Sequence, residues 1–228
     1  MSRIRSFVKQ TGYRIARASE WGLPDDRLDL TGDRDVEWAW VAAKFPLDAG
    51  HVLDFGPATS NSPLMAAFNA KSVTAFDLDP PPVSFSSPNL RYVKGDILQG
   101  ELPEGPFDTI VNCSTIEHVG LSGRYGNLEE TDGDLRAMDL LRERLAGPKA
   151  RMIFTIPVGR DGVYRPYHRV YGPERLPRIL AGHSVCEALF YAKTGSVNIW
   201  QQVSKAEALS VQGSENFYAL GLFVLAAG

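Results

Sequence analysis

Short apolar runs alternate with helical stretches from residue 49 onward, and this alternation limits the possible folds more than any other feature of the sequence. Two stretches have helical character, 63–70 and 133–145, and the second carries its large apolar residues on one face. The apolar runs have the length of buried β-strands and lie at 49–55, 72–77, 90–93, 107–113 and 151–156. Such an alternation predicts an α/β fold, with a parallel sheet and helices on both of its faces.

The C-terminal part of the sequence departs from this alternation. Residues 185–191 and 217–225 predict two further strands, separated by a polar, partly helical stretch around 200–209. The last run is apolar and no helix follows it, which favours an antiparallel strand inserted into the sheet. With Pro157 ending the fifth strand, we expect a mostly parallel, seven-stranded sheet whose last strand is antiparallel.

Residues 1–45 precede the first predicted strand. They include a predicted helix at 35–43, whose core-facing residues are expected to be Val36, Trp40 and Val41. The basic first part fits either a helix that caps the domain and helps to cover its site, or a helix that lies on a membrane surface. We therefore expect an N-terminal helical extension, 1–45, and a ligand-binding domain, 46–228.

Composition and charge narrow the class of protein. Hydrophobic residues make up 44% and charged residues 22%, as in soluble globular proteins. The net charge of −3 provides no basic field for nucleic acid. No run approaches the roughly 20 apolar residues of a transmembrane helix, and the basic N-terminus lacks the continuous apolar run of a signal peptide. Cys113 and Cys186 form no metal-spaced pair. We expect a reduced, cytoplasmic protein.

Two predicted strands end in residues that suit a nucleotide-like ligand. The first leads into the turn Asp54-Phe55-Gly56-Pro57-Ala58, in which Gly56 allows the backbone to approach a ligand closely. The second ends at Asp77, 21 residues after Gly56. An acid there can accept hydrogen bonds from both hydroxyls of a ribose. Asp79 is the nearby alternative, and an acid at this position fits NAD equally well.

These two segments and two that follow them resemble class I S-adenosylmethionine-dependent methyltransferases. Lys94-Gly95-Asp96-Ile97 resembles the segment whose carboxylate reaches the adenine amino group, and 107–112 (FDTIVN) is similar to the strand beneath the reactive sulfonium. Ala58 and Ser60 stand where this superfamily usually has its second and third glycines. The resemblance implies a Rossmann-like fold, S-adenosylmethionine as cofactor, and contacts to it from Asp54, Gly56, Pro57, Ala58, Asp77, Leu78, Asp96, Ile97, Asn112 and Cys113.

The segment after the fourth predicted strand carries a second resemblance. Glu117-His118-Val119 is similar to the "LEHV" segment of many small-molecule methyltransferases. Residues 114–121 (STIEHVGL), with Arg124-Tyr125-Gly126, more closely resemble a methyltransferase-like family of unknown function, which 155–159 and 168–172 also fit. The resemblance covers roughly residues 35–215, and it implies the fold and the cofactor more firmly than the substrate.

Two histidines are candidates for a general base. A hydroxyl acceptor must lose its proton as it attacks the methyl group, and a neutral histidine can remove that proton near physiological pH. His118 and His168 are predicted on loops at the same sheet edge, so either can be the base. Glu117 then orients a histidine or binds the acceptor. In the alternative interpretation, Glu117 and His118 begin a helix and only close the cofactor pocket.

The neighbouring residues indicate the kind of acceptor. Arg165 and Arg169, with Tyr125, suit a polar acceptor such as a sugar, or a carboxylate or phosphate group. Some enzymes with the "LEHV" segment bind a divalent metal through acids just upstream. Here residues 113–115 are Cys, Ser and Thr, which are poor ligands for Mg²⁺, so we expect no metal.

We therefore expect methyl transfer to a hydroxyl of a small polar metabolite or a saccharide. N-methylation stays open because a neutral amine is already nucleophilic. A second alternative is a methyltransferase-like protein that binds ligands without catalysis, because two of the usual glycines are replaced in the turn after the first strand. An NAD-dependent oxidoreductase is the third alternative, although no separate substrate domain is predicted. The sequence does not predict an oligomeric state.

Overall fold

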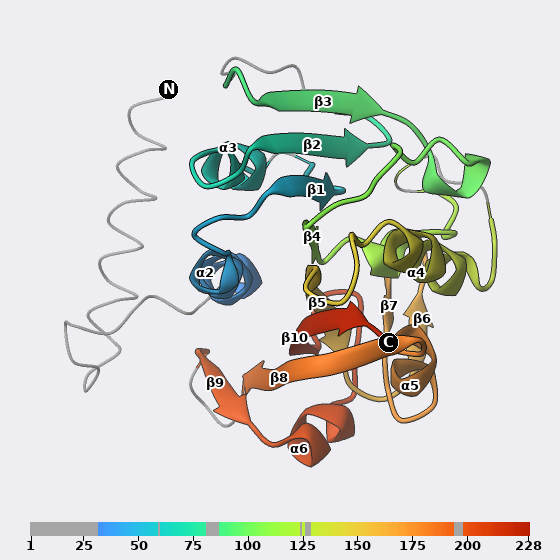
Figure 1. The fold of residues 1–228 in the computed structure, drawn as a ribbon. Coiled ribbons are helices and arrows are strands. Elements are labelled where there is room, and N and C mark those ends of the chain that lie inside the picture. The colour runs from blue at the N-terminus through green and yellow to red at the C-terminus, as the bar shows by residue number, and fades with distance from the viewer. Residues whose placement is uncertain (1–31, 59, 81–86, 124, 126–128, 194–197) are drawn as a thin grey trace, which may run out of the picture.

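A single large sheet organises the chain. The computed structural model describes residues 32–58, 60–80, 87–123, 125, 129–193 and 198–228. In them the large sheet has eight strands in the order β3-β2-β1-β4-β5-β10-β8-β9, and β6 and β7 form a separate hairpin (Figure 1). The strands of the large sheet are β1 (His51–Phe55), β2 (Ser72–Asp77), β3 (Leu90–Lys94), β4 (Thr109–Cys113), β5 (Arg151–Val158), β8 (His183–Lys193), β9 (Trp200–Val203) and β10 (Ala219–Ala227). The hairpin joins β6 (Gly162–Tyr164) to β7 (His168–Val170).

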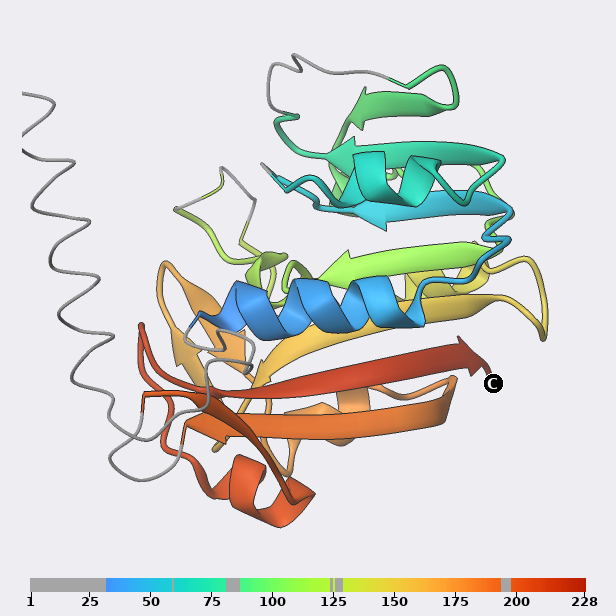
Figure 2. The ribbon, with the colours of Figure 1, turned by 90° about the vertical axis from the view of Figure 1, so that its left-hand side faces the viewer.

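Strands β1 to β5 form the parallel half of the sheet, and all five lie where the sequence predicts them. β1 pairs with β2 and β4, β2 with β3, and β4 with β5, always in parallel. Apolar residues on both faces of β1, β2 and β4 are buried, as the apolar runs require in a sheet covered on both sides. The carboxyl ends of the parallel strands meet at one edge, on the left in Figure 2.

The other half of the sheet is antiparallel. β10 lies between β5 and β8 and runs antiparallel to both, which confirms the expected inserted last strand. The sheet has eight strands and not seven, because Trp200–Val203 pairs with the end of β8 as the edge strand β9. Gln201 and Gln202 are both exposed, so this edge strand lacks the apolar alternation that sequence reasoning uses.

The expectation that Pro157 ends the fifth strand is wrong. β5 continues to Val158, and Pro157 is paired with Leu220 of β10. A proline removes a hydrogen-bond donor, so it is tolerated where no neighbouring strand needs that donor. On this side β4 ends at Cys113, opposite Thr155, and Tyr171 then pairs with the end of β5. The Tyr171 amide donates to the Pro157 carbonyl and its own carbonyl accepts from Gly159, so the missing donor of Pro157 is not needed.

Helices cover both faces of the sheet, as expected. On one face lie α2 (Asp33–Lys44) and α3 (Ser62–Ala67), and on the other α4 (Gly133–Glu143) and α5 (Arg175–Ile179), left and right of the sheet in Figure 1. The short helix α6 (Lys205–Ser210) follows β9. Two 3₁₀-helices, η1 (Ile97–Gln99) and η2 (Ile116–His118), follow β3 and β4.

Helix α2 is the described part of the expected N-terminal extension, whose residues 1–31 lie outside the described residues. Val36, Trp40 and Val41 are buried, as predicted, and pack with Val111 of β4 and Ile153 of β5 in one apolar cluster. This packing fixes α2 on the sheet, with its first turn close to the carboxyl ends of the strands.

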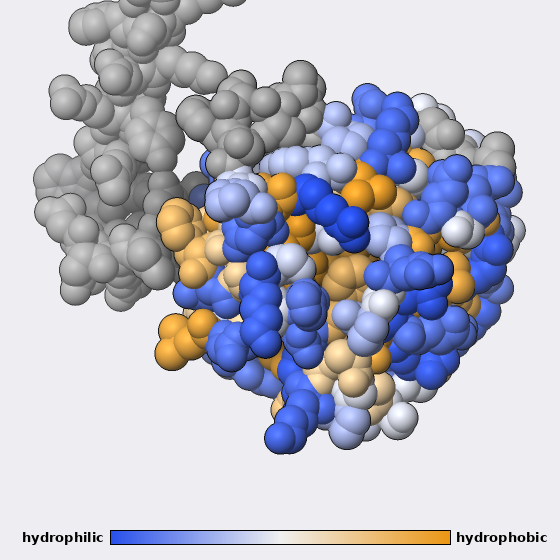
Figure 3. Space-filling view, turned by 45° about the horizontal axis from the view of Figure 1, so that its top comes forward, coloured by the Kyte–Doolittle hydropathy of each residue, from blue (hydrophilic) through white to orange (hydrophobic). Residues whose placement is uncertain are grey.

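Hydrophilic side chains cover most of the face seen in Figure 3, with smaller hydrophobic patches among them. This mixture is ordinary for a folded protein. In the described part of the chain, no helix combines the length and apolar character that a membrane span needs.

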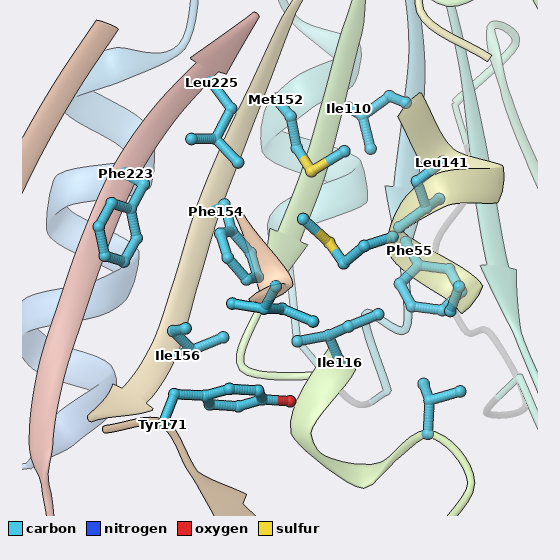
Figure 4. Close-up of a cluster of buried hydrophobic side chains, with 14 of the residues drawn as sticks. Phe55, Ile110, Ile116, Leu141, Met152, Phe154, Ile156, Tyr171, Phe223 and Leu225 are labelled. Atoms are coloured by element: carbon cyan, nitrogen blue, oxygen red, sulfur yellow. The ribbon is translucent and has the colours of Figure 1, made fainter. Parts of the chain in front are cut away.

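The largest core cluster fills the space between the sheet and α4 (Figure 4). Met152 and Phe154 of β5 contribute to it, as does Leu141 of α4. Ile116 of η2 is fully buried in the same cluster. Burial of a side chain of this size is worth about 1.5–3 kcal/mol. The core therefore anchors the loop that carries Glu117 and His118.

Candidate functional site

A cavity of about 490 Å³ opens where the parallel strands end. The strand order reverses between β1 and β4, and open α/β sheets bind their ligands at the carboxyl ends beside such a switch point. The volume is typical of sites for small molecules. Nine of the ten predicted cofactor contacts line it, namely Asp54, Gly56, Pro57, Ala58, Asp77, Leu78, Asp96, Ile97 and Cys113. The tenth, Asn112, does not; its side chain is fully buried beside Met138 of α4.

The turn after β1 requires glycine at position 56. Gly56 has a φ of +66°, and a Cβ atom there would lie 2.0 Å from Cγ2 of Thr115. Thr115 Oγ1 also donates to the Gly56 carbonyl at 2.9 Å. Ala58, at a position where the superfamily usually has glycine, still adopts a left-handed φ of +48°. The turn thus keeps a conformation that glycine favours although one glycine is replaced.

Asp77 at the end of β2 connects two turns of the cavity wall. Its Oδ2 accepts a hydrogen bond from the Ala58 amide at 2.9 Å, and its Oδ1 accepts one from the Asp79 amide at 3.1 Å. Asp79, the alternative acid, is mostly exposed and forms an ion pair with Lys94 at 3.0 Å. Of the two, Asp77 is the carboxylate fixed at the strand tip.

The segment after β3 supplies apolar surface and one carboxylate. A Cβ atom at Gly95 would lie 2.8 Å from the Phe76 ring, so glycine allows this ring to pack on the backbone. Ile97 is buried, and Leu78 lines the same cavity. Asp96 Oδ1 accepts from the Leu98 amide at 2.9 Å and caps η1.

Asp54 is a buried carboxyl on the cavity wall, with only 1% of its surface exposed. Burial raises its pKa to about 7, although the Ser62 hydroxyl, which donates to it, acts in the opposite direction. The nearby Asp77 raises this pKa further. At neutral pH the carboxyl is therefore divided between its neutral and charged forms.

The first turn of α2 brings an arginine, held by a buried glutamate, to the cavity wall. Arg34 lines the cavity, and its Nη1 lies 2.8 Å from Oε2 of the fully buried Glu37. Ser114 and Thr155 donate hydroxyl hydrogen bonds to Oε1 of Glu37. Burial acts to lower the pKa of Arg34, but Glu37 and other nearby acidic groups outweigh it and raise the pKa. The guanidinium therefore stays charged beside the cavity.

His118 lines the cavity at the end of η2. Its Nδ1 lies 2.5 Å from the Tyr167 carbonyl oxygen. A carbonyl can only accept, so Nδ1 carries the proton and Nε2 carries the lone pair of the neutral ring. The ring packs against Tyr125, with 4.8 Å between the ring centroids. Tyr125, a predicted substrate contact, lines the cavity as well.

Glu117 lies behind His118 and does not line the cavity. Only 2% of its surface is exposed, and Oε1 is 3.6 Å from Nε2 of His118. Oε2 is buried without a hydrogen-bond partner among the described residues. Burial raises the pKa of this carboxyl to about 8. This position suits a group that acts through His118 better than one that touches an acceptor.

Besides Asn112 and Glu117, three more predicted site residues do not reach the cavity. His168 is buried in the β6–β7 hairpin, where its Nε2 is 3.1 Å from the Ser214 carbonyl oxygen and its ring meets the edge of Tyr218. Arg165 is half exposed and paired with Glu129. Arg169 is 2% exposed and bound to backbone carbonyls. The hairpin packs against η2 at the predicted sheet edge, but these three side chains do not line the cavity.

Sequence reasoning missed the contribution of α2. Arg34 and Trp38, both on α2, line the cavity. Ser114 and Thr115, which follow β4, line it as well. The spacing of Arg34 and Trp38, one helical turn apart, places them on one face of a helix. Nothing in the local sequence indicates that this face meets the ends of β1 and β4. Among the described residues, no group of three or more His, Cys, Asp or Glu side chains could hold a metal ion.

A family model described as "Caenorhabditis protein of unknown function, DUF268" matches residues 101–217, just over half of the 228 residues. The chain belongs to this family. The part of this DUF268 protein that matches includes η2, the β6–β7 hairpin and the whole segment 113–121, but not β1 to β3. No curated protein sequence matches this DUF268 protein.

Solved structures resemble the DUF268 protein over most of its length. The N-methyltransferase NodS from Bradyrhizobium japonicum WM9, in complex with S-adenosyl-L-homocysteine, is 18% identical with a TM-score of 0.57, covering 91% of each chain. A TehB-like SAM-dependent methyltransferase from Corynebacterium glutamicum is 18% identical with a TM-score of 0.52, covering 98% of this chain and 100% of its own. A putative S-adenosylmethionine-dependent methyltransferase from Listeria monocytogenes is 12% identical with a TM-score of 0.54, covering 84% and 98%. These likenesses confirm the Rossmann-like methyltransferase fold.

Proposed function

We propose that this protein binds S-adenosylmethionine and transfers its methyl group to a small-molecule acceptor. The observation that carries the proposal is the convergence of the Gly56 turn, Asp77 and Asp96 on one cavity. These three features come from three different strands, and their order along the chain is the one that the superfamily uses. The likeness to structures described as S-adenosylmethionine-dependent methyltransferases supports it.

The cavity offers the groups that the adenosyl part of this cofactor needs. Phe76, Leu78 and Ile97 provide apolar surface for a purine. Asp77 has acceptor oxygens for the two ribose hydroxyls, and Asp96 lies on the adenine side. Gly56 lacks a Cβ atom because Thr115 occupies that position, and its backbone lines the cavity where the ligand would approach it.

The remaining charges suit the methionine part, which carries an ammonium and a carboxylate. Asp54 and Arg34 lie on the cavity wall with opposite charges available. We propose that Asp54 holds the ammonium and Arg34 the carboxylate. Charge-assisted hydrogen bonds of this kind are about twice as strong as neutral ones.

When bound, the cofactor supplies an electrophilic methyl group on a sulfonium. This chain's part is to hold the acceptor and to take its proton. His118, whose Nδ1 donates to the Tyr167 carbonyl, has its lone pair on Nε2 and can accept that proton. The buried carboxyl of Glu117, with Oε1 3.6 Å from Nε2, lies where it can orient this ring. The aromatic rings of Trp38 and Tyr125 line the cavity and suit a polar acceptor with an apolar face, such as a saccharide.

Thermal unfolding with saturating S-adenosylhomocysteine or NAD tests the cofactor. We expect the first to raise the melting temperature, because a ligand that prefers the native state stabilises it by mass action. Asp77→Ala should weaken S-adenosylhomocysteine binding by about 1–3 kcal/mol, measured by calorimetry. The comparison variant Asp79→Ala should weaken binding less than Asp77→Ala does, because the Asp79 side chain, although at the cavity, is mostly exposed and paired with Lys94. Stabilisation by NAD alone would refute the proposal.

Transfer of a tritiated methyl group to a deproteinised metabolite extract tests catalysis. His118→Ala should lower turnover by about 10²–10⁴-fold, the usual effect of losing a general base. S-adenosylhomocysteine affinity should stay within about twofold. His168→Ala is the comparison variant, and a loss of turnover only there would move the base to His168. Normal turnover in both variants would indicate an amine acceptor.

A further inference from the structure

The guanidinium of Arg169 binds the backbone on both sides of His118. Nη1 donates to the Val119 carbonyl at 2.6 Å and lies 3.4 Å from the Glu117 carbonyl. The side chain is only 2% exposed, so water does not compete for these bonds. Hydrogen bonds from a charged donor are stronger than those between neutral groups. Arg169 therefore fixes the backbone of the residue that the proposed function makes the base.

The same guanidinium is itself held in place from its other side. Nη2 lies 3.3 Å from the carbonyl oxygens of Glu130 and Thr131, and Nε lies 3.8 Å from the fully buried carboxylate of Asp134. Arg175 also binds this carboxylate, through Nε at 2.9 Å. The planar fork of an arginine can serve several acceptors at fixed angles, which the single ammonium of a lysine cannot do.

The ring of His118 is oriented by the same hairpin. The carbonyl that accepts from Nδ1 belongs to Tyr167, two residues before Arg169. Residues 167–169 thus contact both the backbone around His118 and its imidazole. Displacement of Arg169 would shift η2 relative to Tyr167 and lengthen the bond to Nδ1.

We propose that Arg169 is a positioning residue. Together with the Tyr167 carbonyl of the same hairpin, it sets the ring orientation and the tautomer of His118. This replaces the expectation from the sequence that Arg169 binds the substrate. The inference rests on the proposed function for its catalytic meaning, but the geometry that it assigns to His118 can be measured without any methyl transfer.

Long-range ¹⁵N–¹H spectra of the histidine rings are the test, with His118 assigned from its loss in His118→Gln. Wild-type protein should show His118 as the single Nδ1–H tautomer. Arg169→Lys should show a mixture of tautomers. Arg175→Lys is the matched control, because Arg175 also binds Asp134 and the Thr131 carbonyl, but neither carbonyl beside His118. Arg175→Lys should lower the melting temperature, as Arg169→Lys should, because both variants lose buried hydrogen bonds. It should nevertheless keep the wild-type tautomer of His118.

The turnover assay adds a second readout. Arg169→Lys should lower kcat by about 10²-fold, as small displacements of a catalytic group do, while S-adenosylhomocysteine affinity stays within about twofold. If Arg169→Lys does not fold, Asp134→Asn, which removes the carboxylate beside the guanidinium, should shift the tautomer in the same direction. A wild-type ring without the Nδ1–H tautomer, or an unchanged ring in folded Arg169→Lys, would overturn the inference. If no methyl transfer is found while the ring behaves as expected, only the proposed function fails.

Discussion

Replacement of Asp54 by asparagine should change how stability depends on pH. The folded protein raises the pKa of this buried carboxyl from 3.8 to about 7. Between these two values the folded state keeps a proton that the unfolded chain has lost, so the free energy of unfolding falls as the pH rises. Each unit of pKa shift is worth about 1.4 kcal/mol, which gives a total of about 4 kcal/mol. Roughly 2.5 kcal/mol of this is lost between pH 5 and pH 8.

Urea unfolding of the ligand-free protein at pH 5 and pH 8 measures this effect. The buried carboxyls of Glu37 and Glu117 also have raised pKa values, so wild-type protein should lose stability across this range. Asp54→Asn should lose about 2.5 kcal/mol less than wild type does. The control Asp139→Asn, an exposed aspartate on α4, should behave like wild type. Equal losses in Asp54→Asn and wild type would mean that Asp54 is not held neutral by burial.

Three further predictions concern ligand binding and catalysis. Gly56→Ala should abolish the thermal shift with S-adenosylhomocysteine because its Cβ would lie 2.0 Å from Thr115, whereas Gly100→Ala, also at positive φ but with open space, should keep the shift. Arg34→Gln should weaken S-adenosylhomocysteine binding in calorimetry by about 10–100-fold but leave 5′-methylthioadenosine, which has no carboxylate, unaffected; equal losses for both ligands would contradict the assigned contact. Methyl transfer should survive EDTA, and a loss that Mg²⁺ restores would show that a metal takes part.

The parallel half of the fold could be predicted because its signals are local. Each strand from β1 to β5 is a continuous apolar run, and the turn residues that follow them stand next to those runs in the sequence. The antiparallel β10 was also predictable, as an apolar run with no helix after it. β9 was not, because its pairing with β8 leaves Gln201 and Gln202 exposed and Trp200 as the one buried residue among the four.

The candidate site was predictable where a strand end carries it, and not where distant segments meet. Asp77 and His118 follow strands directly, and both line the cavity. Arg34 comes to the same cavity only because α2 packs across β4 and β5, a contact between segments at least 65 residues apart (109 − 44). The residue type of Arg169 and its place after β5 suggest a ligand contact, whereas in the structure its side chain is buried and bound to backbone carbonyls.

The position of β10 in the sheet has a consequence for how the chain folds during synthesis. β10 lies between β5 and β8, although both are made before it. Until the ribosome has released residues 219–227, β8 and β9 can pair only with each other, and β5 has an open apolar edge on that side. Unpaired edges of this kind favour aggregation. A chain that lacks residues 219–227 is therefore expected to need a chaperone, whereas one from which the ribosome has released them is not.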